Sequence, residues 1–188
     1  MNIDQGRILL SIARATIARK LGKTVSANEG GAWLQERGAC FVTLMQNGQL
    51  RGCIGTLEAY RPLLQDVKAN AEAAAFHDPR FTPLLPAELD TIEVEVSLLS
   101  AMRGMTFGSE SEALAQLRPG VDGIVLEYGR SRSTFLPQVW EQLPDPAEFM
   151  AHLKYKAGLS PTFWAKEIKL SRYTVSKWTE RDLEATAQ

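Results

Sequence analysis

The sequence is poor in the residues that build metal centres and cross-links. Its 188 residues include only two cysteines, Cys40 and Cys53, and two histidines, His77 and His152. Protein zinc sites normally take at least three ligands, mostly Cys and His, at short spacings, and neither a CxxC nor an HExxH motif is present. We therefore expect no metal site. The sequence points to no particular cofactor.

Long hydrophobic runs and an excess of charge are also missing. No apolar stretch approaches the roughly 18 residues that span a bilayer, and residues 1–23 mix charged with apolar positions, unlike the core of a signal peptide. We therefore expect no membrane association. Two cysteines without an export signal are typical of reduced thiols, so the expected compartment is the cytoplasm. The formal net charge of −1 gives no electrostatic reason to expect nucleic acid as a partner.

What is present predicts an α+β protein with antiparallel sheets and packed helices. Hairpins with helices between them favour this class over a parallel sheet built from βαβ units. In residues 92–98, apolar residues alternate with Glu93, Glu95 and Ser97, as in a half-exposed antiparallel strand. The second half of the sequence again predicts a hairpin with helices around it, as the first half does. We predict one domain, 1–188, with sub-domains of roughly 1–105 and 106–188.

The strongest local signal is a β-hairpin. Residues 40–45 predict a strand, Asn47-Gly48 suits the left-handed angles of a two-residue turn, and residues 50–57 predict the return strand. The return strand carries Arg51-Gly52-Cys53-Ile54-Gly55. An Ala-rich helix follows from Pro62 and ends near His77, because Pro79 disfavours helix for the preceding residue.

Cys53 is the first candidate site residue, and two interpretations are open. As a nucleophile, it would be activated by Arg51 or another cation, while Gly52 and Gly55 let a substrate approach the backbone. Alternatively, Cys53 is a small buried residue, and the glycines make room for the Ala-rich helix. Strand alternation places Arg51, Cys53 and Gly55 on one face, which argues against a dry core.

The stretch His77-Asp78-Pro79-Arg80 is the second candidate. His77 is predicted as a catalytic partner of Cys53, because a histidine beside an aspartate can move protons near neutral pH. Asp78 and Arg80, with Arg51, Gly52 and Gly55, are predicted to bind substrate. The competing interpretation is structural, with Asp78 and Arg80 tying down the turn by capping and ion pairing. Glu93 and Glu95 share a polar face and more often line the wet side of a sheet than act as an acid/base pair.

Residues 154–178 combine basic and aromatic side chains. The stretch contains six basic residues and one acidic residue, Glu167, and five aromatic residues are interleaved with them. This composition occurs in surfaces on which nucleotides stack, but a solvated face is the favoured interpretation. No GxxxxGKS/T or GxGxxG phosphate loop is present. The basic residues are Lys154, Lys156, Lys166, Lys169, Arg172 and Lys177.

Six blocks in order resemble the AMMECR family: LRGCIGTLEAYRPL, AAAFHDPRFTPL, EVEVSLL, GVDGIVLEYG, FLPQV and KAGL. The resemblance extends from about Phe41 to Tyr173. It implies an intertwined two-part α+β fold, and Memo-like and radical-SAM proteins as pathway partners, but no particular reaction. Two positions depart from the usual pattern, because Asp122 stands where many members have histidine and Lys154-Tyr155 where many have cysteine.

Two functions of different class follow. In the first, the chain is an enzyme or the catalytic subunit of a modification pathway, and a small molecule or peptide binds in a cleft around LRGCIG. In the second, the chain is a non-catalytic adaptor, and the same residues form a docking surface. An exposed Cys53 in a polar setting favours the first, and a sealed Cys53 under an apolar patch favours the second.

Overall fold

The chain folds into two compact units. A computed structural model describes residues 3–185. One unit comprises the residues up to Leu99 together with the segment from Ser176, and the other comprises Ser100–Val175. The C-terminal segment thus returns to the first unit, because β8 (Val175–Thr179) pairs in the first sheet. This division differs from the expected one at about residue 105.

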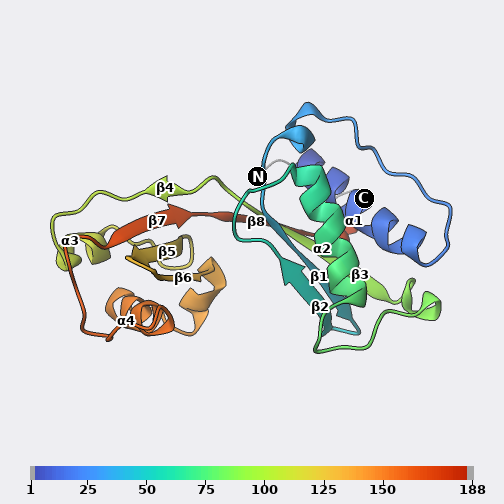
Figure 1. Cartoon of the computed structure of the whole chain (residues 1–188). Helices are drawn as coiled ribbons and strands as arrows, with labels where there is room; N and C mark the ends of the chain where they lie inside the picture. Colours follow the sequence, from blue (N-terminus) through green and yellow to red (C-terminus); the bar gives the residue numbers. More distant parts are fainter. Residues whose placement is uncertain (1–2, 186–188) are drawn as a thin grey trace. The chain divides into compact units, whose positions relative to one another are not determined.

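The first unit is a four-stranded antiparallel sheet with helices packed on one face (Figure 1). The strand order is β2-β1-β3-β8. Helices α1 and α2 pack against each other and against the sheet. The bounds are α1 Ile3–Lys20, β1 Cys40–Gln46, β2 Gln49–Gly55, α2 Leu63–Phe76, β3 Ile92–Leu99 and α5 Glu180–Ala185, with short 3₁₀ helices at Ala32–Gln35 and Pro86–Glu88.

The predicted hairpin is confirmed. Asn47 and Gly48 have φ values of 52° and 77°, the left-handed angles that this turn requires. Gln46 pairs with Gln49 and Met45 with Leu50, but Leu44 pairs with Gly52. Arg51 is therefore the extra residue of a β-bulge, and it interrupts the strict alternation expected between Arg51 and Cys53.

The helix-covered face of this sheet forms the core of the first unit. Val42, Leu44, Val94 and Val96 are all fully buried there. Gly52 allows α2 to lie close to β2, because a Cβ at this position would be 2.1 Å from the carbonyl oxygen of Ala74. Arg51 and Cys53, the residues on either side of Gly52, therefore lie on a strand against which α2 packs closely.

The second unit has its own four-stranded antiparallel sheet, in the order β4-β7-β5-β6, and its own core. Trp140 and Phe149 stack in this core with ring centroids 3.7 Å apart. Asp145 caps α4 by accepting hydrogen bonds from the N–H groups of Ala147 and Glu148. The bounds are β4 Arg103–Gly104, α3 Glu110–Ala115, β5 Gly123–Tyr128, β6 Ser131–Phe135, α4 Pro146–Lys156 and β7 Lys169–Tyr173, with a 3₁₀ helix at Pro137–Glu141.

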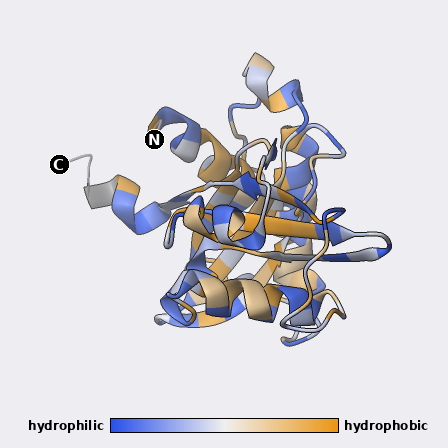
Figure 2. Cartoon of the chain, turned by 90° about the vertical axis from the view of Figure 1, so that its left-hand side faces the viewer, coloured by the Kyte–Doolittle hydropathy of each residue, from blue (hydrophilic) through white to orange (hydrophobic). Residues whose placement is uncertain are grey.

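The predicted α+β class with antiparallel sheets is confirmed. The segment that follows α4 contains two strands, β7 and β8, one in each sheet. Hydrophobic residues concentrate on the strands and on one side of the helices, while turns and loops are mostly hydrophilic (Figure 2). Among the described residues, no helix is long and apolar enough to cross a bilayer.

Candidate functional site

Cys53 lies on the sheet face opposite the helices, in a row of polar side chains. The row crosses the first sheet, because Cys53 pairs with Thr43 and Thr43 pairs with Glu95. The Thr43 hydroxyl donates a hydrogen bond to Sγ of Cys53 at 3.2 Å. Glu95 forms an ion pair of 2.6 Å with Lys177 of β8. Thr43 is thus the polar neighbour that contacts the sulfur of Cys53 directly.

The two cysteines differ in their surroundings. Cys40 is fully buried on the helix-covered face, where burial, reinforced by the charge of Asp66, raises the pKa of its thiol far above the ordinary value. Cys53 is only partly buried, and both thiols are free. Because the two side chains point to opposite faces of one sheet, no disulfide can join them. Cys53 is therefore the chemically accessible thiol of the pair.

Asp78 and Arg80 hold the main chain of Cys53 from the edge of the sheet. Oδ2 of Asp78 accepts from the N–H of Cys53 at 2.9 Å, and Nη2 of Arg80 donates to its carbonyl oxygen at 3.1 Å. Arg80 and Asp78 also form an ion pair of 2.7 Å. Since β2 is an edge strand, this pair takes the place of a neighbouring strand and protects the edge.

Asp78 holds the main chain of Cys53 in its ionised, carboxylate form. Its residue surface is only 4% exposed. The hydrogen bonds from Arg80, opposed by burial and supplemented by the N–H of Cys53, hold the pKa of Asp78 well below its ordinary value. Asp78 is therefore a charged group at neutral pH whose hydrogen-bonding capacity is used to fix Cys53.

Arg51, Gly52 and Gly55 also make contacts within the chain. Arg51 forms an ion pair of 2.9 Å with Glu88 and donates to the carbonyl oxygen of Thr82 at 3.0 Å. Gly52 faces the main chain of α2, and a Cβ on Gly55 would be 2.1 Å from the ring of Phe41. The space that the glycines clear is thus filled by the chain itself. The role of these residues in substrate binding stays a prediction.

His77 lies at the C-terminal end of α2, where its N–H donates to the carbonyl oxygen of Ala73. Its side chain is 65% exposed and its Nε2 lies 3.9 Å from a carboxylate oxygen of Glu72. Among the described residues, no hydrogen bond joins His77 to Cys53. The structure thus brings Asp78 and Arg80 to Cys53, while a pairing of Cys53 with His77 stays a prediction.

Thr43 and Lys177 belong to the same row as Cys53, and the sequence analysis did not single them out as site residues. The turn at Asn47-Gly48 alone would place Thr43 opposite Gly52, and the bulge at Arg51 shifts the register by one residue so that Thr43 pairs with Cys53. Lys177 lies on β8, more than 120 residues after Cys53 in the sequence. No local sequence pattern indicates that its side chain reaches Glu95. Within the described part of the chain, no three His, Cys, Asp or Glu side chains gather in a group that could hold a metal ion.

Both positions that depart from the family pattern are engaged in the second unit. Asp122 is fully buried and forms an ion pair of 2.6 Å with Arg118. Lys154, only 2% exposed, forms an ion pair of 2.7 Å with Glu110. Each residue is thus a buried charge with an opposite partner, which stabilises its burial.

The fold and the thiol-bearing sheet define an α+β protein of two antiparallel sheets, with LRGCIG on an edge strand of the first. The sequence model of the AMMECR1 family matches residues 10–178. The chain belongs to the AMMECR1 family, as its sequence blocks predict.

Similar proteins come from archaea. The chain is 36% identical over 185 residues to protein MJ0810 of Methanocaldococcus jannaschii, covering 96% of this chain and 92% of that protein. It is 39% identical over 176 residues to a protein of Methanothermobacter thermautotrophicus, covering 90% and 91%. The crystal structure of the uncharacterized protein PH0010 from Pyrococcus horikoshii superimposes with a TM-score of 0.76 at 32% identity, covering 94% of this chain and 92% of that one.

Proposed function

We propose that the chain is an enzyme, or the catalytic subunit of a modification pathway, whose substrate is bound beside Cys53. The observation that carries this proposal is the hydrogen bond from the Thr43 hydroxyl to Sγ of Cys53, 3.2 Å long, on a polar and partly exposed sheet face. The sulfur of Cys40 also accepts a hydrogen bond, from Nδ2 of Asn70 at 3.7 Å, but Cys40 is fully buried. What distinguishes Cys53 is therefore that its sulfur meets a hydroxyl donor on a partly exposed face of the sheet.

The support for the Cys53 peptide adds to this proposal. Reactive groups work best when the structure holds them in place before the substrate arrives. The N–H and the carbonyl oxygen of Cys53 are both engaged, by Asp78 and Arg80. The ion pair of Arg51 with Glu88 fixes the bulge two residues earlier. In this proposal Asp78, Arg80 and Arg51 position Cys53.

The second candidate function is that of a non-catalytic adaptor. It is favoured by a specific observation, namely that the space beside Gly52 and Gly55 is occupied by Ala74 and Phe41 of the chain itself. A substrate would then have to bind without entering that space. In both functions we propose, from the family resemblance, that Memo-like and radical-SAM proteins act in the same pathway.

Affinity capture with mass spectrometry distinguishes the two functions. Immobilised wild-type protein and the Cys53→Ser variant are exposed to a small-molecule and peptide extract, and both the retained compounds and the mass of the Cys53-containing peptide are recorded. If Cys53 reacts, the wild type acquires a covalent adduct on that peptide, and the variant retains the same compound only reversibly. If the chain is an adaptor, both proteins retain the same set and no adduct forms.

A further inference from the structure

A cavity of about 530 Å³ lies wholly within the second unit, between the ends of β4 and β7. Three arginines line it: Arg103 from β4, Arg172 from β7 and Arg118 from the segment after α3. The volume falls within the range of small-molecule sites in proteins, which is roughly 300–1,000 Å³. None of these arginines belongs to the polar row around Cys53.

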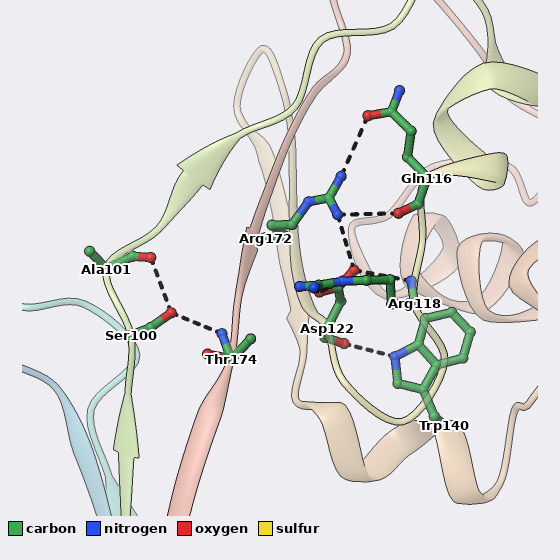
Figure 3. Close-up of polar contacts among 8 residues, drawn as sticks. All are labelled: Ser100, Ala101, Gln116, Arg118, Asp122, Trp140, Arg172 and Thr174. Carbon is green, nitrogen blue, oxygen red and sulfur yellow. Dashed lines mark hydrogen bonds and ion pairs between the residues drawn. The ribbon is translucent and has the colours of Figure 1, made fainter. Parts of the chain in front are cut away.

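One buried carboxylate orients two of the arginines (Figure 3). Asp122 is fully buried and accepts from Nε and Nη2 of Arg118 at 3.0 and 2.6 Å. Nη1 of Arg172 lies 3.5 Å from the other oxygen of Asp122 and donates to the carbonyl oxygen of Gln116 at 3.2 Å. Asp122 is held in turn by Trp140, whose Nε1 donates to its carbonyl oxygen at 2.7 Å. The two guanidinium groups are thus fixed before any ligand arrives.

The third arginine has no such counter-charge. Arg103 stands directly opposite Arg172 in the β4–β7 pairing, and like charges at opposite positions of a sheet destabilise it. Arg103 is exposed, and within residues 3–185 it has no ion-pair partner. Arg118 likewise retains a 54% exposed side chain and an Nη1 without a hydrogen bond among the described residues.

We propose that this cavity binds the phosphate group of a small phosphorylated molecule. The site combines three guanidinium groups with one carboxylate, that of Asp122. Two positive charges therefore remain unbalanced, and a ligand with two negative charges can neutralise them. A phosphate monoester near pH 7 supplies that charge and three acceptor oxygens, to which guanidinium groups bind in charge-assisted pairs. Because Asp122 already orients Arg118 and Arg172, binding orders few further side chains.

Isothermal titration of the full chain with simple probes tests the proposal. The probes are phenyl phosphate as a monoester, inorganic phosphate as the free ion, and succinate as a dianion without phosphorus. We expect both phosphates to bind saturably and succinate to bind at least tenfold more weakly. Tighter binding of phenyl phosphate identifies an organic phosphate as the ligand class, and equal binding identifies the free ion, so these arms distinguish the two sources.

The Arg103→Ala variant tests the assignment to this cavity. Loss of one charge-assisted contact is expected to weaken the binding of phenyl phosphate by about 10- to 100-fold. The thermal midpoint should not fall, because Arg103 is exposed on a two-residue edge strand and its removal relieves the like-charge pairing with Arg172. Arg130→Ala is the matched control, because Arg130 is an exposed arginine of the same unit in the β5–β6 turn. It should bind as the wild type does.

Four results overturn the proposal. They are no saturable binding of either phosphate below about 10 mM, equal affinity for succinate, equal binding by the wild type and Arg103→Ala, and an equal loss in Arg130→Ala. A phosphopeptide or an oligonucleotide that binds more than a hundredfold tighter than phenyl phosphate would overturn the assignment to a small molecule.

Discussion

The main-chain N–H of Cys53 donates a hydrogen bond of 2.9 Å to Oδ2 of Asp78, a residue 25 positions further along the chain. This contact joins the two stretches that the sequence marks as candidate site residues. It gives Asp78 a positioning role, because the carboxylate contacts the peptide of Cys53 rather than its thiol.

Replacing Asp78 with alanine is expected to destabilise the protein by about 1–3 kcal/mol, because the partly buried N–H of Cys53 loses its partner. Urea unfolding followed by circular dichroism measures the change. Asp90→Ala serves as the control, since Asp90 is an exposed acid of the same unit, and it should stay within about 0.5 kcal/mol of the wild type. Equal unfolding midpoints for Asp78→Ala and the wild type would contradict the positioning role.

Stability should depend on pH through Asp78. The pKa of Asp78 is lower in the folded chain than its ordinary value of 3.8, because of the hydrogen bonds from Arg80. The unfolded state therefore binds the proton more readily. The stabilisation is complete well above pH 4 and is lost as the pH falls through about 4 and below. Unfolding free energies at pH 6 and pH 3 should differ more in the wild type than in Asp78→Asn, and equal differences would refute the linkage.

Two strand glycines should respond differently to alanine. Gly52→Ala places a Cβ 2.1 Å from the carbonyl oxygen of Ala74, whereas a Cβ on Gly104 meets nothing within 4 Å. Because a main-chain oxygen cannot rotate away, Gly52→Ala is expected to cost about 1–3 kcal/mol or more. Gly104→Ala should be nearly neutral. Thermal unfolding of both variants checks the contrast, and similar midpoints would show that α2 does not pack as closely on β2 as described.

Arg51→Ala separates a positioning role from a direct role in binding. The guanidinium group is paired with Glu88, and its side chain is only 12% exposed. We expect a loss of stability of about 1 kcal/mol and a slower reaction at Cys53, with Arg51→Lys recovering part of each. A variant with unchanged stability that fails to retain an anionic compound would instead assign Arg51 to the ligand.

The parts of the fold that depend on local chemistry could be predicted from the sequence. Asn47-Gly48 fixed the hairpin and the two pairs next to the turn, Gln46 with Gln49 and Met45 with Leu50, whereas the four pairs beyond the bulge are shifted by one residue. The bulge at Arg51 could not be predicted, because it depends on the packing of Gly52 under α2. Likewise, the strict alternation that placed Arg51 beside Cys53 assumed an uninterrupted strand.

The candidate sites could be predicted only in part, because they are assembled by contacts between residues far apart in the sequence. Asp78 and Arg80 were identified as candidates, but their hold on Cys53 depends on where the loop after α2 lies. Arg103 and Arg172 are 69 positions apart and become neighbours only through the β4–β7 pairing. The sequence marked Arg172 only as part of a basic, aromatic stretch and gave no indication of Arg103, so the arginine-lined cavity emerged from the structure alone.

The rate at which iodoacetamide modifies each thiol of the native protein tests the central claim most directly. Intact-mass and peptide analysis over time should show Cys53 modified first and Cys40 only after unfolding, because burial seals Cys40 and raises the pKa of its thiol. Thr43→Val should slow the modification of Cys53 by removing the hydroxyl that donates to its sulfur. If Cys53 reacts as slowly as Cys40, or if Thr43→Val leaves its rate unchanged, Cys53 is not the reactive group of this protein.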